Sequence, residues 1–258
     1  IDGLIYYIKP SMEHFSGMTV IAAMGQLFYS MSLAMGIMIT YGSYMKKDNN
    51  LESSVRQIEV FDTGIAFMAG LMIIPAVFAF TAEQLGQGPG LMFIMLPKVF
   101  NSMPMGRAIG TLFFILVFFA ALTSSISLME TIVSILRDKF HWSRKFTCIL
   151  VTAVALVMGI PSSLGFGIWS HIKFLDFSIL DAFDFISNSV LMPILAFFTC
   201  IFVGFIIKPK AVIDEVKSSD GVFKGEKLFT IMIKWIAPIF LVAILVSSVG
   251  NAMGWWTI

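Results

Sequence analysis

The chain contains 258 residues, of which 58% are hydrophobic and only 13% are charged. Its mean hydropathy of +0.90 is typical of an integral membrane protein, in which the few charges lie between long apolar segments. The formal net charge of +1 indicates no class of partner. The short stretches between the apolar segments exclude a separate soluble module.

Six uncharged runs are long enough for the roughly 20 apolar residues that a helix needs to cross a bilayer. They occupy residues 15–45, 63–82, 108–129, 146–170, 185–207 and 235–258. We therefore predict an all-α integral membrane protein with a single membrane domain. The predicted spanning helices are residues 18–45, 53–82, 107–136, 145–168, 180–207 and 228–256.

Lysine and arginine side chains collect in the first, third and fifth connections between these helices. By the positive-inside rule these connections are cytoplasmic, so both ends of the chain are predicted to be external. Residues 1–17 have neither an initiator Met nor a signal-peptide pattern, and we predict an external loop there. We also expect an N-terminal portion of the protein, containing further helices, to precede this chain.

The first predicted span contains the stretch FYSMSLAMGIM, with Ser30, Ser32 and Gly36 near its middle. These residues weaken a helix, and a helix can break at membrane depth only where it faces protein, water or a ligand. Small residues in spanning helices also serve close packing or bond back to a carbonyl. A functional break therefore requires a second polar cluster elsewhere in the chain.

Asp62 stands just before the second uncharged run, residues 63–82. This carboxylate is either solvated at the interface or turned toward a cation inside the protein. The second alternative requires the helix to begin a few turns earlier, near Ser53. The next connection, residues 83–106, combines a glycine and proline cluster with an apolar run too short to span, and we predict an external lid-like loop or an ordinary structured loop.

The third predicted span supplies the second polar cluster. Thr123, Ser124 and Ser127 follow an i, i+1, i+4 spacing, which places three hydroxyls on one helical face. Hydroxyl and carbonyl oxygens suit a hard cation, and a neutral set lets a monovalent ion leave again. A helix face packed through polar side chains is the alternative.

Two remaining features argue against other kinds of site. Cys148 and Cys200 lie in apolar runs, where free thiols behave as small apolar side chains, so neither a disulfide nor a metal site is supported. Asp62 and Asp184 could form the carboxylate pair of an intramembrane enzyme, but the predicted topology places them in opposite halves of the membrane. We predict that the protein is not an enzyme.

Three motifs resemble, in their order and spacing, the sixth, eighth and tenth helices of the neurotransmitter:sodium symporter family. They are GQLFYSMSLAMGIMITYGSYMKKD at 25–48, FFAALTSSISLMETIVSILRD at 118–138 and LDAFDF at 180–185. The likeness runs from the loop before the sixth helix through an eleventh helix. It implies the second inverted repeat of this transporter fold plus one further helix, with a broken helix at 20–45; the fold is a standard example of broken helices and inverted repeats.

The resemblance also implies a set of site residues. The implied sodium ligands are Ser30, Asp62, the carbonyl of Ala120, Thr123 and Ser124. The implied amino-acid pocket is lined by Tyr29, Ser32, Met35, Ser124 and Leu128. The implied gating residues are Asp184 on the external side and Tyr44 and Asp138 on the cytoplasmic side.

The implied function is sodium-coupled symport of a neutral amino acid, hydrophobic or aromatic, across the bacterial inner membrane by alternating access. Its cofactors are sodium ions, with no organic cofactor and no nucleic-acid partner. Asp62 stands where several bacterial members have Asn, and Ala66 where some have Glu. A carboxylate at this position supplies the negative charge that animal relatives obtain from chloride, so transport is expected not to require chloride.

Met35 replaces a rigid Phe found in some relatives, and its flexible side chain predicts a pocket that tolerates bulky substrates. The expected partners are the amino-acid substrate, the lipid bilayer and the missing N-terminal helices of the same transporter. The alternatives are a channel-like or structural membrane subunit, or an inactive fragment that lacks its first half.

Overall fold

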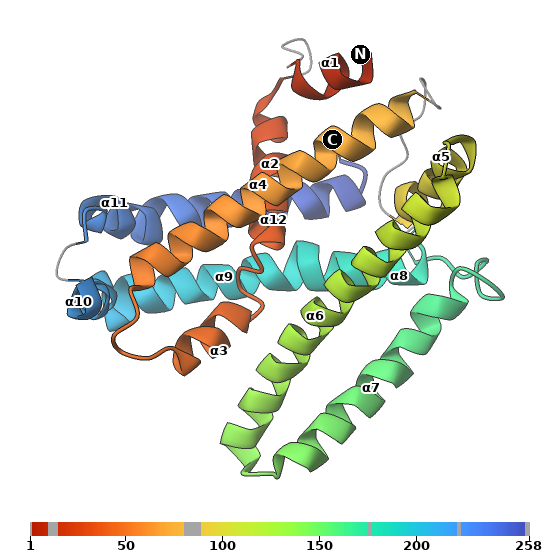
Figure 1. The fold of residues 1–258 in the computed structure, drawn as a ribbon. Coiled ribbons are helices and arrows are strands. Elements are labelled where there is room, and N and C mark those ends of the chain that lie inside the picture. Colours follow the sequence, from red (N-terminus) through yellow and green to blue (C-terminus); the bar gives the residue numbers. More distant parts are fainter. Residues whose placement is uncertain (1, 10–14, 80–88, 175–176, 221–222, 256–258) are drawn as a thin grey trace. The chain divides into compact units, whose positions relative to one another are not determined.

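The structure is a computed structural model that describes residues 2–9, 15–79, 89–174, 177–220 and 223–255 (Figure 1). Within these residues the regular structure is helical, and β pairing is limited to one isolated bridge between Phe174 and Phe177. Some predicted features lie outside the described residues. They are the ends of two predicted spans, at residues 82 and 256, residues 10–14 of the predicted N-terminal loop, and residues 83–88 of the predicted lid-like loop.

Among the described residues, five helices are long and apolar enough to cross a membrane. They are α4 (Leu51–Phe78), α6 (Gly106–Phe140), α7 (Arg144–Leu164), the continuous helical segment Ile179–Ile207 and the continuous helical segment Glu226–Ala252. The first predicted span, residues 18–45, is a helix in two pieces, α2 (Gly17–Ser30) and α3 (Ile37–Tyr44). The all-α fold and the broken first helix are therefore confirmed.

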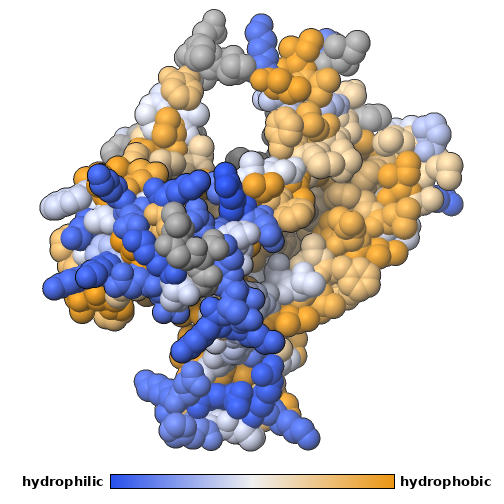
Figure 2. All heavy atoms as spheres, turned by 60° about the vertical axis from the view of Figure 1, so that its left-hand side comes forward, coloured by the Kyte–Doolittle hydropathy of each residue, from blue (hydrophilic) through white to orange (hydrophobic). Residues whose placement is uncertain are grey.

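Most of the apolar surface of these helices is not covered by the chain itself. In the most apolar window of α6, 0% of the residues are buried. Figure 2 shows hydrophobic side chains over broad areas of the visible face, with hydrophilic side chains gathered in separate patches. A surface of this kind is stable only against lipid or against further apolar helices.

The chain divides into two compact units: Ile1–Phe15 with Gln57–Ile126, called unit 1, and Ser16–Arg56 with Ser127–Ile258, called unit 2. In unit 1, residues expected to form only a loop include a helix, α1 (Asp2–Ile8). Tyr6 stacks on Phe78 with ring centroids 5.2 Å apart. A Cβ at Gly3 would lie 2.8 Å from the Cα of Pro75, so glycine is needed for α1 to approach α4 this closely.

Unit 1 also contains a short helix in the predicted lid-like segment. A π-helical turn, η1 (Leu91–Met95), leads into α5 (Leu96–Ser102). Leu96 and Val99 are buried against Val77 of α4, which makes this cluster the apolar core of the unit. These contacts fix α5 on α4, because burying each such side chain contributes about 1.5–3 kcal/mol.

Unit 2 is built around two of the long helical segments. The segment Ile179–Ile207 comprises α8 (Ile179–Asp184), η2 (Phe185–Leu191), α9 (Met192–Ile201) and η3 (Phe202–Ile207). The segment Glu226–Ala252 comprises α11 (Glu226–Ile231), η4 (Met232–Ile236) and α12 (Ala237–Ala252). Helices α9 and α12 lie side by side, and their core is formed by Ala196, Cys200 and Leu241 (Figure 1).

An additional helix, α10 (Pro209–Asp220), connects these two segments. The apolar runs did not predict α10, because the helix is too polar to cross a membrane. Lys217 near its end forms an ion pair with Glu226 at the start of α11. This pair links the two ends of a connection that the distribution of basic residues places on the cytoplasmic side.

Candidate functional site

The break between α2 and α3 has a defined backbone geometry. Helix α2 starts with a capping box, in which Ser16 and Thr19 each accept a hydrogen bond from the other's backbone N–H. At its end the regular i to i−4 pattern stops: Ser32 N donates to Tyr29 O and Leu33 N donates to Phe28 O. The helical hydrogen-bond ladder is therefore interrupted inside the motif FYSMSLAMGIM.

Three alternate residues in the break have left-handed backbone conformations. The φ angles are 54° at Ser32, 62° at Ala34 and 79° at Gly36. This conformation costs about 1–2 kcal/mol for a residue with a Cβ, whereas glycine adopts it freely. Strain of this kind persists only where surrounding contacts hold it, and it is typical of functional sites.

Contacts on both sides hold the break in place within unit 2. Phe28 and Ala34 pack against the α9–α12 core. On the other side, Gly36 faces Thr131 of α6 so closely that a Cβ at Gly36 would lie 2.9 Å from Thr131 Cγ2. Gly36 therefore satisfies two requirements at once, a left-handed backbone and a close approach to α6.

The predicted amino-acid pocket residues of unit 2 lie at this break. Tyr29 is in the last turn of α2 with 45% of its surface exposed, and Ser32 and Met35 lie in the interrupted segment and are half-buried. Leu128, on α6, is also in unit 2. Ser30, the predicted sodium ligand of this group, is the last residue of α2, immediately before the break.

The other predicted sodium ligands belong to unit 1. Thr123 Oγ1 donates a hydrogen bond to Ala120 O at 2.9 Å, so two of the predicted oxygens are neighbours on α6. A hydroxyl that donates to a carbonyl can still offer its own lone pairs to a cation. Among the described residues the Ser124 hydroxyl makes no hydrogen bond, while that of Ser125 donates to Ala121 O at 2.7 Å.

Asp62 lies well inside its helix. Asn50 Oδ1 accepts a hydrogen bond from Ser53 N at 2.7 Å, which caps the start of α4. The helix thus begins at Leu51, and Asp62 lies about three turns from that end. Its surface is half-buried.

These oxygens suit a hard monovalent cation better than a transition metal. They are hydroxyls, carbonyls and one carboxylate, with no thiolate or imidazole. In the described part of the chain, no three His, Cys, Asp or Glu side chains come together as a metal site would require.

The predicted gating residues have different surroundings. Tyr44 Oη donates to Glu130 Oε1 at 2.8 Å. Asp138, predicted to act with Tyr44, makes no hydrogen bond or ion pair among the described residues. Asp184 directly precedes the π-helical segment η2, and its Oδ1 accepts a hydrogen bond from the side-chain amide of Asn188.

Sequence reasoning missed the residue that joins Tyr44 to the neighbouring helices. Glu130 of α6 also accepts a hydrogen bond from Arg144 Nη2 at 2.6 Å, at the start of α7. The Glu130 side chain is only 15% exposed, against 58% for Arg144. A second link, Tyr41 Oη to Ser127 Oγ at 2.6 Å, lies one turn away. Together these contacts fix α3 on α6.

A signal for Glu130 was present in the sequence. It is the single acidic residue between Gly106 and Asp138, in a helix otherwise apolar or neutral apart from its ends. An ionisable residue inside a spanning helix indicates a specific partner. The partners themselves, Tyr44 and Arg144, are distant in sequence and come close only through the fold.

Comparisons with known proteins give a consistent set of relatives. Residues 1–254 match the profile of the sodium:neurotransmitter symporter family. The chain is 32% identical to an uncharacterized sodium-dependent transporter of Haemophilus influenzae over 96% of its length and 54% of the relative's. It is 26% identical to the sodium- and chloride-dependent glycine transporter 1 of Xenopus laevis, covering 96% of this chain and 40% of that protein.

A solved structure gives the same result for the fold. The crystal structure of MhsT in complex with L-phenylalanine matches with a TM-score of 0.85 at 36% identity. The match covers 96% of this chain and 56% of that one. The chain thus spans about half the length of the Haemophilus influenzae relative and of MhsT.

The Tyr44–Glu130 hydrogen bond is open to a double-mutant cycle in the full-length protein. Tyr44→Phe and Glu130→Ala, alone and combined, are expected to show a coupling free energy of about 1 kcal/mol in SDS-induced unfolding, because each change removes the same hydrogen bond to a charged group. As the control, Tyr6→Phe alters a tyrosine of unit 1 and is expected to show no coupling to Glu130→Ala. A Tyr44–Glu130 coupling indistinguishable from this control would contradict the predicted link.

Proposed function

Because this chain belongs to the sodium:neurotransmitter symporter family, we propose that it forms part of a transporter that couples sodium entry to uptake of a neutral amino acid. The observation that carries the proposal is the break between α2 and α3, in the first predicted span. Its left-handed residues at 32, 34 and 36 lie within the motif that resembles the family's unwound helix. An interrupted helix offers the backbone oxygens that ion and substrate need at membrane depth.

The proposed ligands are those that the resemblance implies. Within unit 2 they are Ser30, Ser32 and the side chains Tyr29, Met35 and Leu128. Within unit 1 they are Asp62, Ala120, Thr123 and Ser124. The remaining contacts to ion and substrate come from helices that lie outside this chain in the full-length transporter, since the relatives are about twice as long.

Coupling follows if sodium and substrate both bind one conformation preferentially, since a ligand with equal affinity for all states shifts nothing. A membrane potential of about 100 mV contributes ~2.3 kcal/mol for each charge that moves across the membrane. Each sodium ion can therefore drive an appreciable accumulation of substrate. The proposed gates act by opening the site to one side at a time, with Asp184 on the external side and Tyr44 and Asp138 on the cytoplasmic side.

We place the full-length protein in the plasma membrane of a bacterial cell, with the first, third and fifth connections facing the cytoplasm. This assignment rests on the five spanning helices, the distribution of basic residues and the bacterial relatives.

The sodium site is tested by neighbouring serines in the full-length protein. Ser124→Ala is expected to weaken sodium-dependent binding of tritiated leucine about tenfold or more, because it removes a neutral oxygen from the ion's shell. Ser125→Ala is the matched control: its hydroxyl is already bonded to Ala121 O, and binding should be retained. Equal losses in both variants, or leucine binding that is the same in potassium and sodium, would exclude this assignment.

The chloride requirement is tested by ion replacement. Because Asp62 supplies a fixed negative charge beside the proposed sodium site, exchange of chloride for gluconate is expected to leave sodium-dependent uptake unchanged. Asp62→Asn removes that charge and is expected to weaken sodium binding in the same assay. A collapse of wild-type uptake in gluconate would show that chloride, and not Asp62, supplies the charge.

The substrate class is tested by competition. The L-phenylalanine bound to MhsT and the flexible side chain of Met35 both support a hydrophobic or aromatic substrate. Tryptophan, tyrosine and leucine are expected to displace bound leucine about tenfold more strongly than glycine or alanine, because a larger apolar side chain is buried. Met35→Phe should reduce competition by tryptophan more than by leucine. Stronger competition by glycine and alanine would contradict the proposed pocket.

A further inference from the structure

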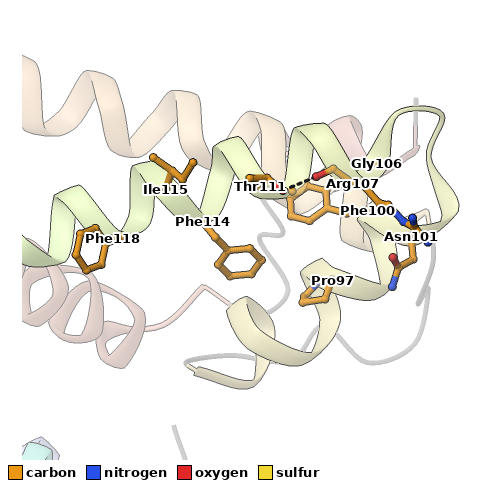
Figure 3. Close-up of a pocket in the computed structure, with 10 residues that line it drawn as sticks. Pro97, Phe100, Asn101, Gly106, Arg107, Thr111, Phe114, Ile115 and Phe118 are labelled. Atoms are coloured by element: carbon orange, nitrogen blue, oxygen red, sulfur yellow. Dashed lines mark hydrogen bonds between the residues drawn. The ribbon is translucent and has the colours of Figure 1, made fainter.

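A groove lies between α5 and the first half of α6, within unit 1. It encloses about 510 Å³, within the range of roughly 300–1,000 Å³ that is typical of ligand pockets. Figure 3 shows Arg107 and Asn101 together at one end and Phe118 at the other. The lining residues are Pro97, Phe100, Asn101, Gly106, Arg107, Gly110, Thr111, Phe114, Ile115 and Phe118.

The groove is distinct from the candidate ion and substrate site. Residues of an α-helix are rotated about 100° from one to the next, so positions on one helix can be compared directly. On α6 the groove residues Arg107, Phe114 and Phe118 form one face. The proposed sodium ligands Ala120, Thr123 and Ser124 lie about 100–160° away from that face. The two sets therefore use different sides of the same helix.

The groove is strongly asymmetric in polarity. Arg107 supplies the charge in the lining, and no acidic residue lines the groove. Among the described residues no carboxylate pairs with Arg107. The Thr111 hydroxyl already donates to Arg107 O at 2.8 Å, which leaves Arg107 and Asn101 as the polar groups at this end. The rest of the lining is mainly aromatic and aliphatic.

The walls of the groove are held by packing. Phe100 contacts Phe113 and Phe114 with ring centroids 5.4 and 6.4 Å away. Two glycines make room for it, since a Cβ at Gly106 would lie 1.6 Å from Phe100 O and one at Gly110 would lie 3.1 Å from Phe100 Cδ2. Leu96 and Val99 of α5 are buried against Val77 of α4, which holds α5 in place. The groove is therefore formed before any ligand binds.

The groove also runs in the direction expected of a lipid. Arg107 is the second residue of α6, at the end that the basic residues place on the external side. From Arg107 to Phe118 the helix rises about 16 Å, roughly half the thickness of the hydrocarbon core. A cationic end at the interface and an apolar end in hydrocarbon match an acyl chain that carries an anionic headgroup.

We propose that this groove binds an anionic phospholipid of the external leaflet. The headgroup phosphate accepts hydrogen bonds from the guanidinium of Arg107 and the amide of Asn101, and one acyl chain lies along Phe114, Ile115 and Phe118. The positive charge of Arg107, with no acidic residue in the lining, favours a headgroup of net negative charge over one that also carries a cation, and the apolar contact favours a lipid over a free phosphate ion.

The test uses the purified full-length transporter and measures retained lipid by native mass spectrometry. The wild-type protein is expected to retain phosphatidylglycerol about tenfold more strongly than phosphatidylcholine, and R107Q is expected to lose this preference. K98Q is the matched control, because Lys98 lies on α5 outside the groove lining and its loss should leave the preference intact. Ile115→Trp fills the groove with Arg107 unchanged and should also release the lipid.

Three results would overturn the proposal. One is an unchanged phosphatidylglycerol preference in both R107Q and Ile115→Trp. Another is displacement of the lipid by inorganic phosphate, which would assign the site to a free anion. The third is an absence of retained phosphatidylglycerol in the wild-type protein, which would mean that another part of the full-length transporter covers the groove.

Discussion

A helix that breaks inside a membrane leaves backbone N–H and C=O groups that hydrocarbon cannot satisfy. The rest of unit 2 follows from this constraint. Helix α2 ends at Ser30 and α3 begins at Ile37, and the segment between them turns through the left-handed residues Ser32, Ala34 and Gly36. The strain at the two residues with a Cβ costs about 1–2 kcal/mol each. The neighbouring helices must supply at least as much.

Two groups of contacts supply that stabilisation. On one side, Phe28 and Ala34 pack into the α9–α12 core. On the other, α3 is joined to α6 by Tyr41 with Ser127 and by Tyr44 with Glu130. Because Glu130 also binds Arg144, a change in the position of α3 alters contacts at the start of α7 as well. The break is thus connected by hydrogen bonds to a region that basic residues place at the cytoplasmic face.

The sequence alone was sufficient for the features that depend on composition and local pattern. The apolar runs located the spanning helices, and Ser30, Ser32 and Gly36 indicated where the first of them breaks. The resemblance to the family supplied the proposed roles of Asp62 and Ser124, which spacing by itself left open. Helices α1 and α10 were not foreseen because each is short and packs or caps through contacts between distant residues. The short apolar run in the predicted lid-like loop did indicate an element where η1 and α5 lie.

Glu130 shows why the remainder could not be predicted. Its charge inside an apolar helix was visible in the sequence, but its meaning depends on Tyr44 and Arg144, which only the packing of α3, α6 and α7 brings to it. The groove beside Arg107 is a similar case, since it exists because Gly106 and Gly110 admit Phe100. Contacts of this kind arise from tertiary structure and leave no periodic signal.

The central claim, that sodium drives transport through a site built on the broken helix, is tested most directly by uptake into proteoliposomes. The full-length protein would be reconstituted with sodium outside and potassium inside, and the accumulation of tritiated leucine would be followed. We predict accumulation above the external concentration that disappears when a sodium ionophore dissipates the gradient. Leucine uptake that is unaffected by the sodium gradient, or that only equilibrates across the membrane, would contradict the account.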